Sequence, residues 1–131
     1  MSSGKGLTKN QRAVFAVLQG AQTPMGAYQI LDQVRDQGLR APLQIYRALE
    51  SLAQKGLVHR IESLNAFVAC SHAPHPEPAA FIICEKCGRA AEITLDECDL
   101  HLTRAAGDHG FEVASVRVEM FGRCAACAEA V

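Results

Sequence analysis

Apolar residues recur at helical spacing in three runs within the first half of the chain. The first run follows Thr8 and Gln11, which form a Thr-x-x-Gln pattern typical of a helix N-terminus. The second follows Thr23-Pro24, which predicts an N-cap and a proline at the first helical position. The third runs from Ala41 to just before Gly56. The apolar stripes are Val14, Phe15 and Leu18, then Ala27, Ile30, Leu31 and Val34, then Ile45, Leu49 and Leu52.

The pattern after Gly56 is typical of a β-hairpin. Two short β-prone runs, 57–62 and 66–70, flank the turn-forming residues 63–65. Three helices followed by a hairpin is the order of a winged-helix domain, a variant of the helix-turn-helix. The sequence therefore predicts this fold for residues 1–70.

The third predicted helix has a polar face opposite its apolar stripe. Gln44 and Arg47 lie on that face, and Tyr46 flanks it. Arginine can donate two hydrogen bonds to guanine and glutamine can pair with adenine, so this face could read a major groove. Arg60 on the hairpin would contact a phosphate. An ordinary solvated helix face is the alternative interpretation.

The second half of the chain predicts a small α/β domain. Residues 71–78 hold three prolines, which is typical of a hinge. Strands are expected at 81–84 and 90–95, a helix from Asp96 to Gly107 or Gly110, and a last strand from Val113 to Phe121. The predicted fold class is α+β: a winged-helix domain at 1–70, a hinge at 71–79 and a small α/β domain at 80–131.

Charge and cysteine both shift at this boundary. Residues 1–69 hold eight Lys or Arg against four Asp or Glu, a net charge of +4, whereas residues 70–131 hold five against ten, a net charge of −5. A basic half suits a polyanion such as DNA. None of the six cysteines precedes Cys70. No apolar run approaches the roughly 18 residues of a membrane span, and no signal peptide is evident. We expect a cytoplasmic protein whose thiols bind metal and not a disulfide partner.

Two CxxC motifs are the most specific chemical pattern in the sequence. Cys84 and Cys87, followed by Gly88, form one thiolate pair, and Cys124 and Cys127 form the other. Two such pairs complete a tetrahedral four-cysteine zinc site. A redox dithiol is the alternative, but it would not need a second CxxC. The predicted zinc is structural and contributes folding free energy.

A second set of metal-binding side chains lies around the hinge. His59 and Cys70 are on the predicted hairpin, His72 and His75 are in the hinge, and Glu92 is on a β-prone run. Each has an ordinary explanation as a surface contact, a small buried apolar residue or a solvated strand residue. Together they offer nitrogen, sulfur and oxygen ligands to a metal that would fix the angle between the two domains.

These motifs together resemble the ferric uptake regulator (Fur) superfamily, and its zinc uptake regulator branch in particular. The resemblance covers nearly the whole chain. It rests on the segments Ile45–Leu49, Gly56–Ser63, Asn65–Cys70, Cys84–Gly88 and the pair Cys124/Cys127. It implies a homodimeric repressor, and no enzyme, that binds an AT-rich inverted repeat of double-stranded DNA when loaded with metal. No membrane and no small-molecule substrate is expected.

The resemblance also implies roles for particular residues. The regulatory zinc ligands would be His59, Cys70, Glu92 and one hinge histidine, preferably His75, with His72 as the substitute. A thiolate at Cys70 favours Zn²⁺ over the harder Fe²⁺. With the structural zinc, this makes two zinc ions per chain. The expected DNA contacts are Arg40, Gln44, Tyr46, Arg47 and Arg60.

The sequence departs from the family pattern at several positions. Gln44 stands where relatives usually have a small hydroxylated residue, so a shifted base preference is expected. The hinge is short, which leaves two histidines for one ligand position. Cys98 and His101 form an i, i+3 pair that we expect to be ordinary helix residues.

Two other functions compete with the metal-dependent repressor. One is a redox-sensing regulator of the same superfamily, in which Cys70 or Cys98 is oxidised. The other is a zinc hydrolase, but the sequence has no HExxH motif, nucleophile elbow or phosphate loop.

Overall fold

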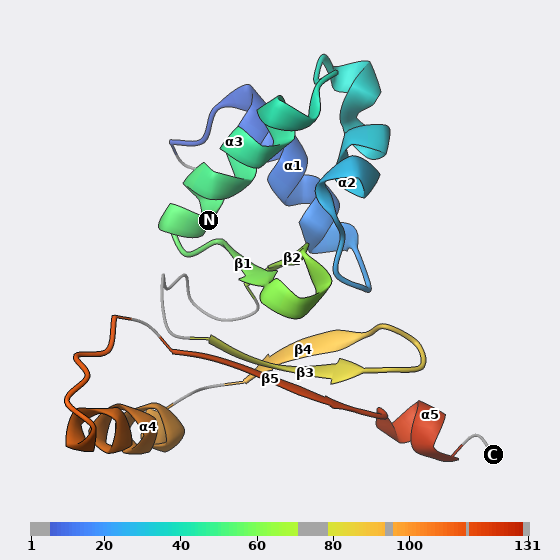
Figure 1. Cartoon of the computed structure of the whole chain (residues 1–131). Helices are drawn as coiled ribbons and strands as arrows, with labels where there is room; N and C mark the ends of the chain where they lie inside the picture. The colour runs from blue at the N-terminus through green and yellow to red at the C-terminus, as the bar shows by residue number, and fades with distance from the viewer. Residues whose placement is uncertain (1–5, 71–78, 94–95, 115, 130–131) are drawn as a thin grey trace. The chain divides into compact units, whose positions relative to one another are not determined.

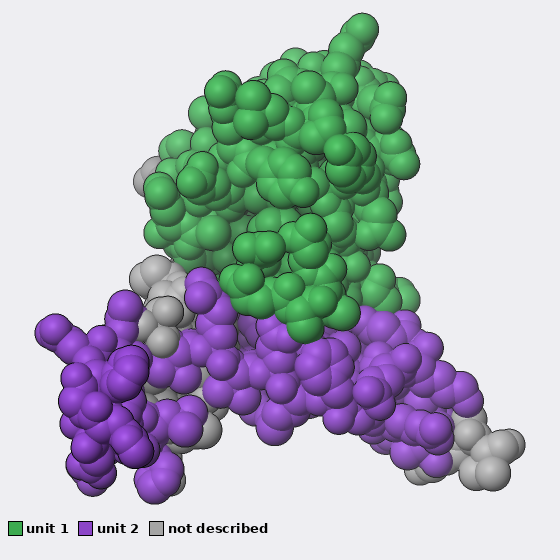
Figure 2. Space-filling model, in the orientation of Figure 1, with its two compact units in different colours: residues 1–76 green, residues 77–131 purple. Residues whose placement is uncertain are grey.

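The described residues form two compact units that contain both helices and strands. A computed structural model of the chain describes residues 6–70, 79–93, 96–114 and 116–129. The first unit is Met1–Pro76 and the second is Glu77–Val131 (Figure 2). The mixture of helices and strands confirms the α+β class. Of the predicted hinge, only Ala79 is described, and it begins a strand. His72 and His75 lie outside the described residues.

The first unit has the predicted order of helices and strands (Figure 1). Its helices are α1 (Lys9–Gly20), α2 (Ala27–Val34) and α3 (Pro42–Gln54), with a short 3-10 turn η2 (Arg35–Gln37) after α2. Its hairpin is β1 (Val58–Ile61) and β2 (Ala66–Ala69), joined through the 3-10 turn η3 (Glu62–Leu64). Three helices followed by a hairpin is the winged-helix order that the sequence predicted.

The start of α1 was predicted correctly and the start of α2 was not. The N–H of Gln11 donates to the Thr8 hydroxyl at 3.1 Å, which is half of a capping box. In contrast, Thr23-Pro24 does not cap α2. The backbone of Met25 pairs with Phe67 of β2, with N···O distances of 3.0 and 2.8 Å. This pairing holds the chain extended, so α2 begins at Ala27 after Gly26.

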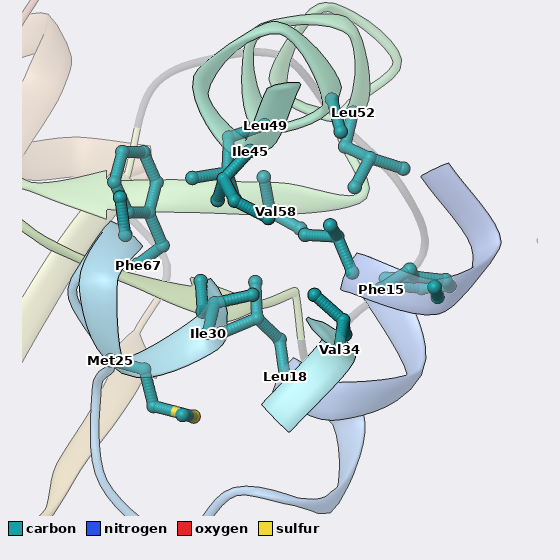
Figure 3. Packing of buried hydrophobic residues seen from close by; sticks show 14 of the residues in the cluster. Phe15, Leu18, Met25, Ile30, Val34, Ile45, Leu49, Leu52, Val58 and Phe67 are labelled. Carbon is teal, nitrogen blue, oxygen red and sulfur yellow. The ribbon is translucent and has the colours of Figure 1, made fainter. Parts of the chain in front are cut away.

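The predicted apolar stripes meet in one core of the first unit (Figure 3). Ile30 of α2, Ile45 of α3 and Val58 of β1 are almost completely buried. Burial of these side chains orients α3, because its apolar side must face α1 and α2. The polar side of α3 is therefore turned outward.

The second unit is a three-stranded sheet with two helices. Its elements are β3 (Ala79–Cys84), β4 (Ala90–Ile93), α4 (Asp96–Asp108), β5 (Arg117–Gly122) and α5 (Ala125–Glu129). The strand order is β4-β3-β5, with β3 antiparallel to β4 and parallel to β5. No helix among the described residues has the length and hydrophobicity needed to span a bilayer.

The last strand is shorter than predicted, and α5 was not predicted. β5 begins at Arg117, opposite Ala79, where its partner strand β3 begins. Val113 and Val116 therefore lie outside the strand, although valine is a β-prone residue. After Cys124 the chain forms α5, which carries Cys127, and no helix was predicted there.

Candidate metal centres and nucleic-acid interface

Backbone pairing in the second unit brings the two CxxC motifs together. Cys84 is the last residue of β3, and the chain turns back after it through Gly88, whose φ is 81°. The N–H of Glu85 donates to the Gly122 carbonyl at 2.8 Å, which ties this turn to the end of β5. Cys124 follows two residues later and Cys127 lies on α5. The parallel pairing of β3 with β5 thus carries both motifs to one end of the sheet.

The four sulfur atoms have the spacing of a tetrahedral zinc site. The sulfurs of Cys84, Cys87, Cys124 and Cys127 all lie within 4.8 Å of one another. The Cys87 and Cys124 sulfurs are 3.8 Å apart. Four thiolates at about 2.3 Å from a tetrahedral Zn²⁺ are separated by about 3.8 Å. The donor set and its spacing fit zinc, and we call these residues the four-cysteine group.

Local hydrogen bonds favour thiolates at two of the four positions. The backbone N–H of Cys87 donates to the Cys84 sulfur at 3.4 Å, and this is the main reason why the pKa of Cys84 falls to about 5. The pKa of Cys124 is lowered chiefly by a backbone hydrogen bond from Cys127. The pKa of Cys127 rises to about 12, mainly because its thiol is hydrogen-bonded to the Cys124 sulfur. If Zn²⁺ replaced the Cys127 thiol proton, this hydrogen bond, the main cause of the raised pKa, would be lost.

His59 and Cys70 lie together on the hairpin of the first unit. His59 pairs with Val68 in the β1–β2 register, and the Cys70 N–H donates to the Leu57 carbonyl at 2.8 Å. His59 and Cys70 are therefore diagonal neighbours on the same face of the hairpin. Their ligand atoms lie within 4.8 Å of each other. The imidazole is 7% exposed and Cys70 is half-buried. A buried imidazole beside a thiol is a donor pair suited to zinc.

Glu92 lies in the second unit, on β4, opposite Phe81 of β3, and it is half-buried. The two hinge histidines, His72 and His75, lie outside the described residues. Cys98 and His101, which we expected to be ordinary helix residues, both belong to α4. His101 is exposed.

The predicted DNA-contacting residues occupy the outer side of the first unit. Tyr46 and Arg47 are exposed on α3, and Arg40 is exposed just before it. Gln44 is half-buried, and its side-chain oxygen accepts hydrogen bonds from the backbone at the start of α3. Ser51, on the same polar face, accepts a hydrogen bond of 3.1 Å from the Gln11 amide of α1.

Arg60 is exposed on β1 and has two partners at the hairpin turn. Its guanidinium donates to Asn65 Oδ1 at 2.9 Å and lies 3.3 Å from a Glu62 carboxylate oxygen. Glu62 and Asn65 had no predicted functional role. Their spacing around the turn is the only signal that could have pointed to them, and it becomes informative only when the turn geometry is known.

Comparison with known proteins identifies the class. Residues 2–121 match the model of the family described as the ferric uptake regulator family. The chain belongs to this family, whose members are DNA-binding transcription regulators and not enzymes. The family resemblance that the motifs indicated is thereby confirmed.

Within the family, the chain is similar to zinc uptake regulators. It is 32% identical over 125 residues to the zinc uptake regulation protein of Escherichia coli (strain K12). The aligned residues cover 94% of this chain and 73% of that protein. It is 28% identical over 130 residues to the zinc uptake regulation protein of Mycobacterium tuberculosis (strain ATCC 25618 / H37Rv), covering 96% and 97%.

Two solved structures are similar over nearly their full length. A zinc uptake regulator complexed with zinc and DNA has a TM-score of 0.89 at 30% identity, covering 98% of this chain and 89% of that chain. The crystal structure of holo XcZur has a TM-score of 0.85 at 38% identity, covering 96% and 90%.

Proposed function

We propose that this chain is a zinc-responsive transcriptional repressor that binds AT-rich palindromic operator DNA when loaded with zinc and controls zinc uptake genes in the cytoplasm. The observation that carries the proposal is the buried His59 imidazole beside the Cys70 thiol, on the hairpin of a ferric uptake regulator family member. A nitrogen and sulfur donor pair favours Zn²⁺ over harder cations. The similar zinc uptake regulators support the same metal.

The proposal assigns two zinc ions to each chain, with different roles. The four-cysteine group holds a structural zinc, since zinc bound by four thiolates within one domain supplies folding free energy. The regulatory zinc is bound by His59, Cys70, His75 and Glu92, with His72 as the substitute for His75. The corresponding domains are 1–70 for DNA binding, 71–79 for the hinge and 80–131 for dimerisation.

The regulatory zinc would act by shifting a conformational equilibrium. It promotes repression only if it binds the DNA-competent arrangement more tightly than the others, and each tenfold preference corresponds to about 1.4 kcal/mol. By linkage, operator DNA must raise the affinity for this zinc by the same factor. The side chains that we propose to touch DNA are Tyr46 and Arg47 of α3, Arg40 before it and Arg60 on the hairpin.

An apolar face of the sheet in the second unit supports a homodimer. Ile82 of β3 is opposite Met120 of β5, so their side chains share a face, and they are 43% and 45% exposed. Ile93 of β4 is 36% exposed and pairs with Ala80, two residues from Ile82, which places it on the same face. Exposed apolar residues gathered on one sheet face are typical of an interface. We propose that a second copy covers this face.

The experiment that tests the proposal is a free-zinc titration of zinc content and operator binding. We expect the wild type to bind two zinc ions per chain and to take up an AT-rich palindrome only as the second site fills. Cys70→Ser should keep one tight zinc and a folded dimer but lose the zinc response. Cys98→Ser, the same chemical change on α4, should behave as the wild type. Normal zinc-dependent operator binding by Cys70→Ser would show that the regulatory site is misassigned.

A further inference from the structure

The side chain of Gln44 closes the N-terminus of α3. Its Oε1 atom accepts a hydrogen bond from the Arg40 N–H at 2.8 Å and another from the Ala41 N–H at 3.1 Å. The N-cap residue is Ala41, which has no side-chain group that could cap the helix. Gln44 is therefore the side chain that satisfies donors at this end of the helix.

This arrangement leaves no acceptor for an adenine. A glutamine reads adenine by accepting from N6–H with its oxygen and donating to N7 with its amide nitrogen. A carbonyl oxygen has two lone pairs, and both backbone donors already occupy the Gln44 oxygen. The orientation of the amide follows from its partners, because two N–H donors require the oxygen to face them.

The same device recurs in the first unit. Gln11 accepts from the Thr8 N–H at 3.1 Å at the start of α1, and Gln29 accepts from the Gly26 N–H at 2.8 Å at the start of α2. None of the three α-helices described in this unit has an acidic residue in its first turn. Glutamate at this position would interact better with the helix dipole, but it would repel a phosphate. A neutral cap adds no negative charge that would repel DNA from the positive end of α3.

We infer that Gln44 is a positioning residue for operator binding: it acts through the backbone of Arg40 and Ala41 and does not read a base. Its neutral side chain fixes the segment that carries Arg40 and sets where α3 begins. The inference rests on the proposed function, in which exposed side chains of α3 contact the operator. It accounts for a glutamine at a position where the family resemblance led us to expect a shift in base preference.

The test compares Gln44→Ala with Gln29→Ala, which removes the same kind of cap from α2. Binding of both variants and the wild type is measured on zinc-loaded protein, with an operator and its single-base-pair substitutions. We expect Gln44→Ala to weaken binding about fivefold on every DNA sequence, a factor that corresponds to the free energy contributed by a helix cap. The order of base preference should not change. Gln29→Ala should destabilise the protein to a similar degree with a smaller loss of operator affinity.

Three results would overturn the inference. Loss of discrimination at one A·T pair in Gln44→Ala would show that Gln44 reads that base. Equal losses of affinity in both variants would show a general effect of stability. If the wild type with zinc binds no operator, the proposed function fails together with this inference, whereas the first two results leave the proposed function intact.

Amide hydrogen exchange of the DNA-free protein tests the cap itself. The Arg40 and Ala41 amides should exchange faster in Gln44→Ala than in the wild type. Gln44→Glu keeps an acceptor oxygen and should restore their protection, but its negative charge should weaken operator binding. If Gln44→Glu leaves both amides as fast as in Gln44→Ala, the side-chain oxygen is not the cap and the inference is wrong.

Discussion

Arg60 and Asn65 are joined across the hairpin turn of the first unit, where the Arg60 guanidinium donates to Asn65 Oδ1 at 2.9 Å. Asn65 has a left-handed backbone with φ 49°, a conformation that asparagine tolerates better than most residues. The Glu62 carboxylate lies 3.3 Å from the same guanidinium. The cation that we propose to meet a phosphate is thus held by two acceptors of its own turn.

Glu62→Gln should strengthen operator binding. The change removes a negative charge that competes with phosphate for Arg60. Because exposed ion pairs contribute at most about 1 kcal/mol, we expect a gain of about two- to fivefold at low salt. Fluorescence anisotropy across a salt series measures it. Asp32→Asn removes the exposed ion pair with Arg35 and should have no such effect. Weaker binding by Glu62→Gln would mean that Glu62 holds Arg60 in its DNA-binding position.

Arg47→Ala should weaken operator binding more than removal of another arginine from the same unit. Arg47 is exposed on the outer side of α3, where a base contact contributes about 1–3 kcal/mol, or roughly five- to 150-fold. The matched control is Arg35→Ala, which removes the same charge from an exposed site beside α2. Equal effects of the two variants would indicate that only net charge matters.

Cys124→Ser should remove the structural zinc and destabilise the second unit. The change takes away one of four sulfurs within 4.8 Å of one another, and zinc bound to such a group supplies folding free energy. We expect one zinc fewer per chain and faster proteolysis within 77–131. Strong chelators should have the same effect on the wild type. A Cys124→Ser protein with full zinc content and protease resistance would contradict the structural role.

Met120→Glu should convert the dimer to a monomer. A carboxylate on the apolar sheet face would be buried without a partner in the proposed interface, which is strongly unfavourable. Sedimentation velocity of the zinc-loaded protein measures the change. Glu119, the neighbour on the other face of β5, offers the control Glu119→Gln, which should remain dimeric. A dimeric Met120→Glu protein would place the interface elsewhere.

Ile45→Ala should destabilise the first unit by about 2–5 kcal/mol. Ile45 is fully buried in the core, and truncation leaves a cavity there. Leu43, two residues earlier on α3, is 57% exposed, so Leu43→Ala should change stability by less than about 0.5 kcal/mol. Denaturant unfolding compares the two variants. Similar losses of stability would mean that α3 packs through a different face.

Much of the fold followed from the sequence because local signals and the final structure agree. The Thr8–Gln11 capping box and the apolar stripe of α3 depend on residues a few positions apart in the chain. The two CxxC motifs were also informative, because four thiols with this spacing favour one kind of metal site.

The tertiary structure decided what depended on partners far along the chain. The start of α2 was missed because Met25 pairs with Phe67, and the start of β5 was missed because β3 sets where pairing can begin. No local pattern encodes either partner.

The sequence by itself determined the chemistry available to this protein: the thiols, the imidazoles, the basic first half and the polar face of α3. The structure decided which of these groups meet. Hairpin register placed His59 beside Cys70, and strand pairing gathered the four-cysteine group. It also directed the Gln44 oxygen to the backbone, because unpaired N–H donors at a helix start are satisfied by the nearest acceptor. Residue types are written in the sequence, but hydrogen bonds and metal sites require distances, and only the folded chain sets those.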